Sequence, residues 1–235
     1  MVIFGVLVAV MCFIGCGGGS SRLAGKWYLA DASTRSASET MEILRDGTAI
    51  IDGMGMAWKT EKNRIFFTSS LGAMAFNYRI SGTMLILEGN DDEYFIYVNN
   101  REETMQGKLE VRWSNGQLRM SGNFNKDGKE HGRFQEFSED GQIILRANFV
   151  NGERHGKIEE FYQNGQIRGI GNFVNGKRHG EFVFNHDNGQ LGASKNCEND
   201  ECVEERFFHH DGREADQRGF FGNFGWYGRR FVGWW

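Results

Sequence analysis

The residues of this chain that could do chemistry are four cysteines and six histidines. Three of the histidines, His131, His155 and His179, recur at intervals of 24 residues. Thiolates and imidazoles are ligands of zinc, which holds each ligand about 2 Å away. A cysteine can instead form a disulfide or carry a lipid. The elements around each residue decide between these chemistries.

The three histidines belong to an internal repeat. Arg133–Gly156 is RFQEFSEDGQIILRANFVNGERHG, and Lys157–Gly180 is KIEEFYQNGQIRGIGNFVNGKRHG. Lys108–Gly132 is a 25-residue copy, and Glu181–Glu204 is a degraded copy that a looser fifth copy follows. Self-similarity at a fixed period indicates a repeat architecture, in which neighbouring units bury an apolar face that one unit cannot bury alone.

Turn signals divide each repeat into two strands. Asn-Gly and Asp-Gly tolerate the positive φ that tight hairpin turns require, and the segments between them are rich in Phe and Ile. We expect residues 108–215 to be almost wholly β, with turns at the Asn-Gly or Asp-Gly pairs of residues 115–116, 140–141, 164–165 and 188–189. Phe149 and Phe173 occupy equivalent positions and are both expected to be buried.

This geometry argues against a shared metal ion. Equivalent positions of successive repeats lie two strands apart, about 9–10 Å, so His131, His155 and His179 are expected to be turn residues. A looser metal candidate combines Cys197 and Cys202 with the adjacent pair His209 and His210. Motifs such as Gly-x-Ser-x-Gly and His-Glu-x-x-His are absent from the sequence. We therefore expect no catalytic residue, cofactor or metal, and no enzyme.

Cys197 and Cys202 also fit a disulfide. They occupy the positions of Phe173 and Arg178 in the preceding repeat, and the polar residues 198–201 between them are expected to form a hairpin turn. Opposed residues of a hairpin have Cα atoms about 4.5–5.5 Å apart, within the range of roughly 4.4–6.8 Å that a disulfide accepts. Export from the cytoplasm would supply oxidising conditions.

The chain begins with an uncharged apolar segment, residues 1–16, MVIFGVLVAVMCFIGC. It is short for a membrane span of about 20 residues and fits the apolar core of a signal peptide. FIGC at residues 13–16 resembles a bacterial lipobox. That resemblance implies a lipoprotein of the bacterial cell envelope, attached to a membrane through Cys16 and facing outside the cytoplasm. Residues 17–21, GGGSS, fit a flexible tether; an uncleaved anchor is the alternative.

Residues 22–104 lack the repeat and are expected to form a small antiparallel sheet or barrel. LAGKWY at residues 23–28 resembles the start of small lipocalin-like domains of bacterial lipoproteins. About 80 residues are few for an eight-stranded calyx with generous loops, so we expect Trp27 in a core rather than in a pocket. The expected strands are Lys26–Ala30, Thr40–Leu44, Thr48–Asp52, Arg64–Thr68, Ala73–Ile80, Met84–Glu88 and Glu93–Val98.

The repeat resembles the MORN-type repeat, in its bacterial variant with a Tyr/Phe-x-Asn-Gly core. WSNG at residues 113–116, FYQNG at residues 161–165 and the Arg-His-Gly ends carry the resemblance, which covers residues 106–215. It implies a scaffold, a membrane-associated module or an antitoxin-like protein. The expected fold is all-β: the N-terminal sheet or barrel, then an elongated antiparallel β-meander of about five repeats within residues 105–235.

The charge composition argues against one class of function, nucleic-acid binding. The net charge is −4, and neither half has the basic excess of a nucleic-acid binder. We expect a non-enzymatic lipoprotein whose repeat surface binds a protein or glycan partner in the envelope. The alternatives are a small apolar ligand in the N-terminal domain and an antitoxin-like protein that neutralises a partner. The aromatic segment Gly219–Trp235 either caps the meander or forms a patch for a partner or membrane.

Overall fold

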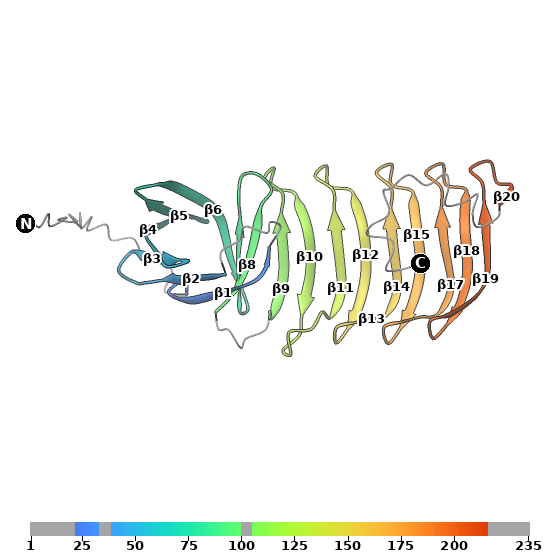
Figure 1. The fold of residues 1–235 in the computed structure, drawn as a ribbon, viewed down its shortest axis with the longest axis horizontal. Helices are drawn as coiled ribbons and strands as arrows, with labels where there is room; N and C mark the ends of the chain where they lie inside the picture. Colours follow the sequence, from blue (N-terminus) through green and yellow to red (C-terminus); the bar gives the residue numbers. More distant parts are fainter. Residues whose placement is uncertain (1–21, 33–38, 100–104, 216–235) are drawn as a thin grey trace, which may run out of the picture.

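The computed structural model of the chain describes residues 22–32, 39–99 and 105–215. Cys16, the tether before the barrel and the segment Gly219–Trp235 lie outside the described residues. The fold is all-β, as predicted: an eight-stranded antiparallel barrel is followed by a twelve-stranded antiparallel sheet (Figure 1). No helix within the described ranges is long and apolar enough to cross a membrane.

The barrel closes in sequence order, with each strand hydrogen-bonded to the next and the last to the first. Its strands are β1 Gly25–Ala32, β2 Thr40–Ile43, β3 Thr48–Ile51, β4 Met54–Glu61, β5 Arg64–Ser69, β6 Gly72–Ser81, β7 Met84–Glu88 and β8 Tyr94–Val98.

Strand β4 was not predicted, and it completes the barrel. Its sequence, MGMAWKTE, holds Gly, Met and Ala, which have weak strand propensity. Eight strands fit into this short region because the turns between them are tight. Asp52-Gly53 connects β3 to β4 with positive φ at both residues, and Lys62 takes positive φ between β4 and β5.

The inside of the barrel is packed with side chains. Leu23, Trp27 and Phe67 are almost fully buried there among aliphatic residues. The Trp27 Nε1–H donates to the carbonyl oxygen of Leu23 at 2.8 Å, so the indole nitrogen is satisfied inside the core. Trp27 is a core residue, as the sequence predicts.

The repeats form one meander that runs away from the barrel (Figure 1), and the predicted turns lie between its strands. Its strands are β9 Gly107–Arg112, β10 Leu118–Phe124, β11 Gly132–Phe137, β12 Ile143–Val150, β13 Glu153–Arg154, β14 Gly156–Phe161, β15 Ile167–Val174, β16 Lys177–Arg178, β17 Gly180–Asn185, β18 Leu191–Glu198, β19 Glu201–Phe208 and β20 Glu214–Ala215.

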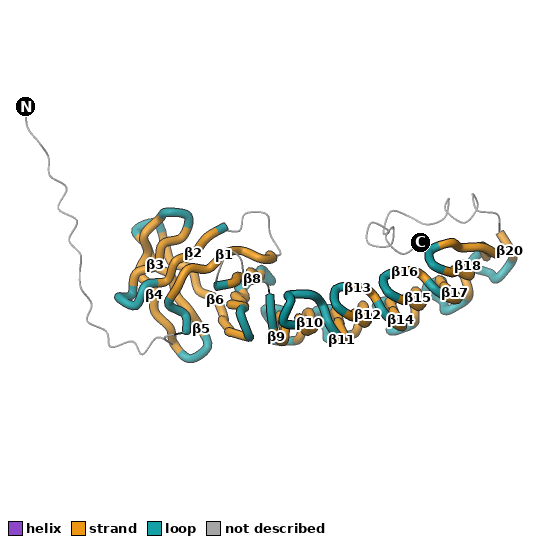
Figure 2. Tube along the Cα trace, turned by 90° about the horizontal axis from the view of Figure 1, so that it is seen from below, coloured by secondary structure: helices purple, strands orange, loops and turns teal. Residues whose placement is uncertain are grey.

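One side of this sheet, here called the phenylalanine face, holds the core of the repeats. Its rings pack edge to face, with centroids 5.5 Å apart for Phe124 and Phe134 and 5.4 Å for Phe173 and Phe182. The short strands β13 and β16 lie to one side of the strand layer (Figure 2), and Arg154 of β13 lies over the Phe173 ring. Phe173 is buried as predicted. Phe149 is only half-buried, so that expectation is wrong.

Small residues make room for the large ones on this face. The Phe182 ring lies so close to Gly171 that a Cβ there would stand 2.3 Å from the ring, and Phe134 lies against Gly122 in the same way. The second repeat has Ala147 at the position of these glycines, and the residue that the β12–β14 register places beside it in the third repeat is the smaller Ile158. Gly with Phe and Ala with Ile are therefore two solutions to the same packing constraint.

Side chains at the Asn-Gly turns join one repeat to the next, and we call this series the turn ladder. Asn115 Nδ2 donates to the carbonyl oxygen of Glu139 at 2.8 Å, and Asn164 and Asn188 donate likewise to Asp187 and His210. Asp140 holds the equivalent position in the second repeat. A carboxylate has no hydrogen to donate, and Asp140 accepts a short hydrogen bond from Ser138 instead.

The first residue of each turn contributes a second set of bonds. The ring nitrogens Trp113 Nε1 and His186 Nε2 bond to the carbonyl oxygens of Phe137 and Phe208 at 3.1 and 2.9 Å. The Tyr162 hydroxyl donates to the carbonyl oxygen of Asn185 at 2.8 Å. Ser138 occupies this position in the second repeat and bonds within its own turn. Within the described part of the chain, the second and third repeats are joined by neither kind of turn bond.

At the opposite ends of the strands, backbone bonds join the second, third and fourth repeats each to the one before it. The N–H groups of Gly152, Gly176 and Asp200 donate to carbonyl oxygens of the preceding repeat at 2.8–3.1 Å. The axes of the strands stay nearly aligned along the whole meander, so the sheet has little twist (Figure 1). Flat sheets of many strands are unusual, and side-chain ladders of this kind stabilise them.

We expect Gly171→Ala to lower the free energy of unfolding by about 1–3 kcal/mol, because the added Cβ overpacks the site against Phe182. Phe182→Ile should relieve the overlap, as Ile158 does beside Ala147. In urea unfolding, the double variant should therefore lose less stability than the sum of the single variants. Strict additivity would show that the glycine does not exist to accommodate the ring.

Asp140→Asn should complete the turn ladder by donating to the carbonyl oxygen of Gln163. We expect a higher unfolding midpoint and slower amide exchange in the third repeat. Asn164→Asp is the matched control: it removes the bond to Asp187 and should change both quantities in the opposite direction. If the two variants change stability alike, the turn ladder does not couple the repeats.

Candidate functional site

The side of the sheet opposite the phenylalanine face is polar, and we call it the polar face. Successive residues of a strand point to opposite sides of the sheet, so the strand register shows which residues lie on the polar face. Its first row consists of cross-strand pairs in which a charged residue faces an asparagine: Lys108–Asn123, Arg133–Asn148, Lys157–Asn172 and Glu181–Asn196. All four charged residues are exposed.

A second row runs alongside the first, and its charges are paired. Glu159 accepts from Arg146 at 2.8 Å and from Lys157 at 2.6 Å. Burial alone would raise the pKa of the Glu159 carboxyl, but Lys157 and Arg146 together hold that pKa below its ordinary value. Lys108 likewise contacts Glu110 at 2.5 Å. The polar face is thus rich in charged groups that largely neutralise one another.

A third row, nearest the Asn-Gly turns, is apolar. Phe137 pairs with Ile143 and Phe161 with Ile167, and all four residues are half-buried. The Arg146 guanidinium lies over the Phe161 ring, 5.7 Å from its centroid. Equivalent members of each row are two strands apart, about 9–10 Å. The first row recurs in four repeats, whereas the Phe–Ile pairs of the third row occur in the second and third repeats.

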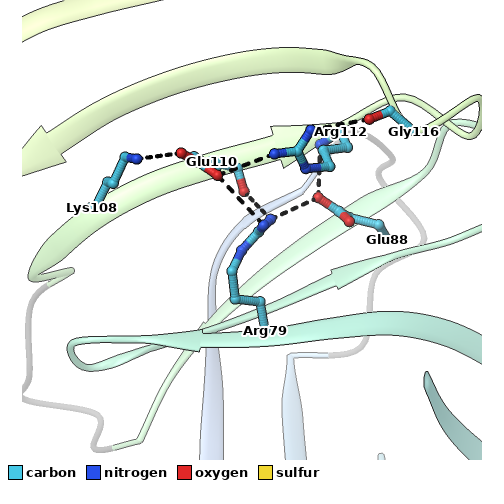
Figure 3. A network of polar contacts seen from close by, with 6 residues as sticks. All are labelled: Arg79, Glu88, Lys108, Glu110, Arg112 and Gly116. Carbon is cyan, nitrogen blue, oxygen red and sulfur yellow. Dashed lines mark hydrogen bonds and ion pairs between the residues drawn. The ribbon is translucent and has the colours of Figure 1, made fainter. Parts of the chain in front are cut away.

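The polar face begins where the barrel meets the edge strand β9, in a network of ion pairs (Figure 3). Arg79 of the barrel donates to Glu88 Oε1 at 3.1 Å and to the carbonyl oxygen of Glu110 at 2.6 Å. The N–H of Arg112 donates to Glu88 Oε1 at 2.7 Å. Beside this network, Met84, Ile86 and Ile96 of the barrel pack against Leu109 and Val111. The barrel and the first repeat thus share a core.

The pKa values of the two carboxylates in this network, Glu88 and Glu110, are shifted in opposite directions. Burial raises the pKa of Glu88 despite the nearby Arg112 and Arg79. The hydrogen bond from Lys108 lowers the pKa of Glu110, which remains closer to solvent.

The recurring histidines lie in connections at the strand ends. The backbone N–H groups of His131, His155 and His179 donate to the carbonyl oxygens of Asn123, Asn148 and Asn172 at 2.8–2.9 Å, so these are turn residues, as predicted. No cluster of three or more His, Cys, Asp or Glu that could hold a metal occurs in the part of the chain that the structure describes.

Cys197 and Cys202 are joined by a disulfide at the end of the β18–β19 hairpin, where they face each other. The turn between them is tighter than the four residues expected. Glu198 pairs with Glu201, and only Asn199 and Asp200 remain in the turn, both with positive φ. The bridge occupies the position of Phe173 and packs against Phe182 in the repeat core.

The fold and its two faces define an elongated protein of stacked β-hairpin repeats. Residues 130–151 and 154–175 match the family described as MORN repeat variant, so residues 130–175 of this chain hold MORN repeats. No curated protein shows a significant match to the chain.

Sequence reasoning missed the polar face as a set of rows. A signal was present: Lys108, Arg133 and Lys157 hold equivalent positions of successive repeats, as do Asn123, Asn148 and Asn172. The strand register was needed to place each basic residue beside its asparagine.

Glu88→Gln and Glu110→Gln should show opposite pH dependence. Glu88 has a raised folded pKa, so the folded state keeps a proton that the unfolded chain loses near pH 4.5. The stability of wild type relative to Glu88→Gln should fall as pH rises through this window. Glu110 has a lowered pKa, so wild type should gain on Glu110→Gln as pH rises toward 4.5. Urea unfolding between about pH 3 and 6 measures both; slopes of equal sign contradict these assignments.

Proposed function

We propose that this protein is a lipid-anchored lipoprotein of the bacterial cell envelope that binds an extended partner through the polar face of its repeats, without catalysis. The observation that carries the proposal is the first row, where Lys108, Arg133 and Lys157 each face an asparagine at the same register position. Stacked repeats that present equivalent groups on one surface suit a long partner.

The repeats are a better candidate for binding than the barrel. The barrel interior is occupied by side chains such as Trp27 and Phe67. The polar face instead exposes charged and amide groups that no core requires. Its shared core with the barrel through Leu109 and Val111 would hold the face in a fixed orientation relative to an anchor that precedes residue 22.

The anchor is tested by Cys16→Ser. If Cys16 carries the lipid, the variant should move from the membrane to the soluble fraction, because the acyl chains supply most of the membrane affinity. Fractionation of cells followed by immunoblotting measures this. A variant that stays in the membrane pellet contradicts the lipoprotein assignment.

The binding face is tested with full-length protein and isolated envelope fragments in a sedimentation assay. Arg133→Ala with Lys157→Ala should raise the dissociation constant about tenfold or more, the effect of losing about 1.4 kcal/mol. The matched control is Lys126→Ala with Lys177→Ala, which removes the same charge from exposed positions outside the three rows. Equal losses in both variants would mean that binding follows net charge and not this face.

A further inference from the structure

We propose that the partner of the polar face is a linear β-1,4-linked polysaccharide, which lies across the strands along the length of the sheet. This inference rests on the proposed function, since it uses the same face, and it adds the chemical class of the partner.

The first argument is the period of the face. Equivalent side chains recur every two strands, about 9–10 Å apart, and the nearly parallel strands keep them in straight rows (Figure 1). In an extended β-1,4-linked glycan each sugar is rotated by about half a turn relative to the one before. The same ring face therefore recurs every second sugar, at a spacing close to that of two strands. Each repeat can then meet one disaccharide in the same way.

The second argument is the chemistry of the first row. Each asparagine amide has two donor hydrogens and an acceptor oxygen, and each Lys or Arg beside it adds further donors. A sugar hydroxyl both donates and accepts, so an amide next to a cation satisfies it in either role. Lys108, Arg133 and Lys157 are exposed, as is Asn123, whereas Asn148 and Asn172 are half-buried. Asn148 Nδ2 also donates to the carbonyl oxygen of Lys157 at 3.2 Å, which orients its amide.

The third argument is the apolar row at the same period. Phe137 and Phe161 are half-buried on the polar face, 24 residues apart in equivalent positions. The faces of a β-linked pyranose ring carry C–H groups, which pack against aromatic rings, while its hydroxyls project from the rim toward polar neighbours. The Arg146 guanidinium lies over the Phe161 ring, 5.7 Å from its centroid, and it supplies donors to a sugar on this side of the sheet. The aromatic row and the polar second row beside it match the two parts of each sugar.

The charge of the face favours a neutral polymer over a polyanion. Lys108 and Lys157 are held by Glu110 and Glu159, and the fourth member of the first row is Glu181. A polyanion would have to displace these carboxylates from their cations, whereas a glycan can hydrogen-bond to both. The three basic members of the row define a site for three disaccharides, about six sugars at one disaccharide per two strands.

The experiment is a calorimetric titration of the full-length protein in detergent with cello-oligosaccharides and chito-oligosaccharides of two, four and six sugars. We expect the affinity of at least one series to rise with length, by about tenfold or more from two sugars to six, because each added disaccharide engages another repeat. Malto-oligosaccharides, which are α-1,4-linked and curved, should not show this rise. Arg133→Ala with Lys157→Ala should remove it, and Lys126→Ala with Lys177→Ala should not.

Three results would overturn the glycan proposal: no binding of either β-1,4 series, equal affinity for malto-oligosaccharides of the same length, or length dependence that persists in Arg133→Ala with Lys157→Ala. If envelope fragments still bind through the polar face while the oligosaccharides do not, the proposed function stands and the glycan proposal fails. If neither binds, both fail. Thermal unfolding of each variant shows whether it is folded.

Discussion

The repeat domain depends on bonds that run from one turn to the next. Each hairpin is held to its neighbour by strand pairing, which alone would let the sheet twist. Asn115, Asn164 and Asn188 add side-chain bonds between repeats at one end of the strands. Backbone bonds such as that of Gly176 add bonds between repeats at the other end. Within the described residues, the second and third repeats have only the backbone bond of these two kinds. Between the first and second repeats, and between the third and fourth, restraint at both ends of the strands keeps equivalent strands in line, and straight rows of side chains follow from it.

The two faces of the sheet serve different purposes. On the phenylalanine face, close packing limits the volume of each side chain: Gly171 accommodates Phe182, and Ala147 accommodates the smaller Ile158. On the polar face, the same kind of pair recurs at the same register position, since Arg133 and Lys157 each lie beside an asparagine. A single layer of strands can therefore hold its core on one side and leave the other available for a partner.

The sequence predicted the features that a few neighbouring residues determine, above all the turns. Asn-Gly and Asp-Gly pairs located the turns of the repeats because few other dipeptides accept their backbone angles. Strand β4 was missed because its Gly, Met and Ala form a strand only when neighbouring strands pair with it. The half-exposure of Phe149 could not be predicted either. The 24-residue pattern makes it equivalent to Phe173, but burial depends on which side chains of the adjacent repeat cover the ring. The rows of the polar face required the register, which depends on a bulge in each hairpin.

The joint in Figure 3 also bears on how such a sheet ends. An open edge strand presents unpaired N–H and carbonyl groups, which are a template for another chain and a route to aggregation. At β9 the barrel supplies two side chains in place of a strand: Arg79 binds the carbonyl oxygen of Glu110, and Glu88 binds the N–H of Arg112. The barrel thus blocks fibre-like growth at one end of the repeats. At the far end of the described sheet, the two-residue β20 pairs with only Phe207 and Phe208 of β19, and the exposed carboxylates of β19 would oppose pairing between two copies by charge repulsion.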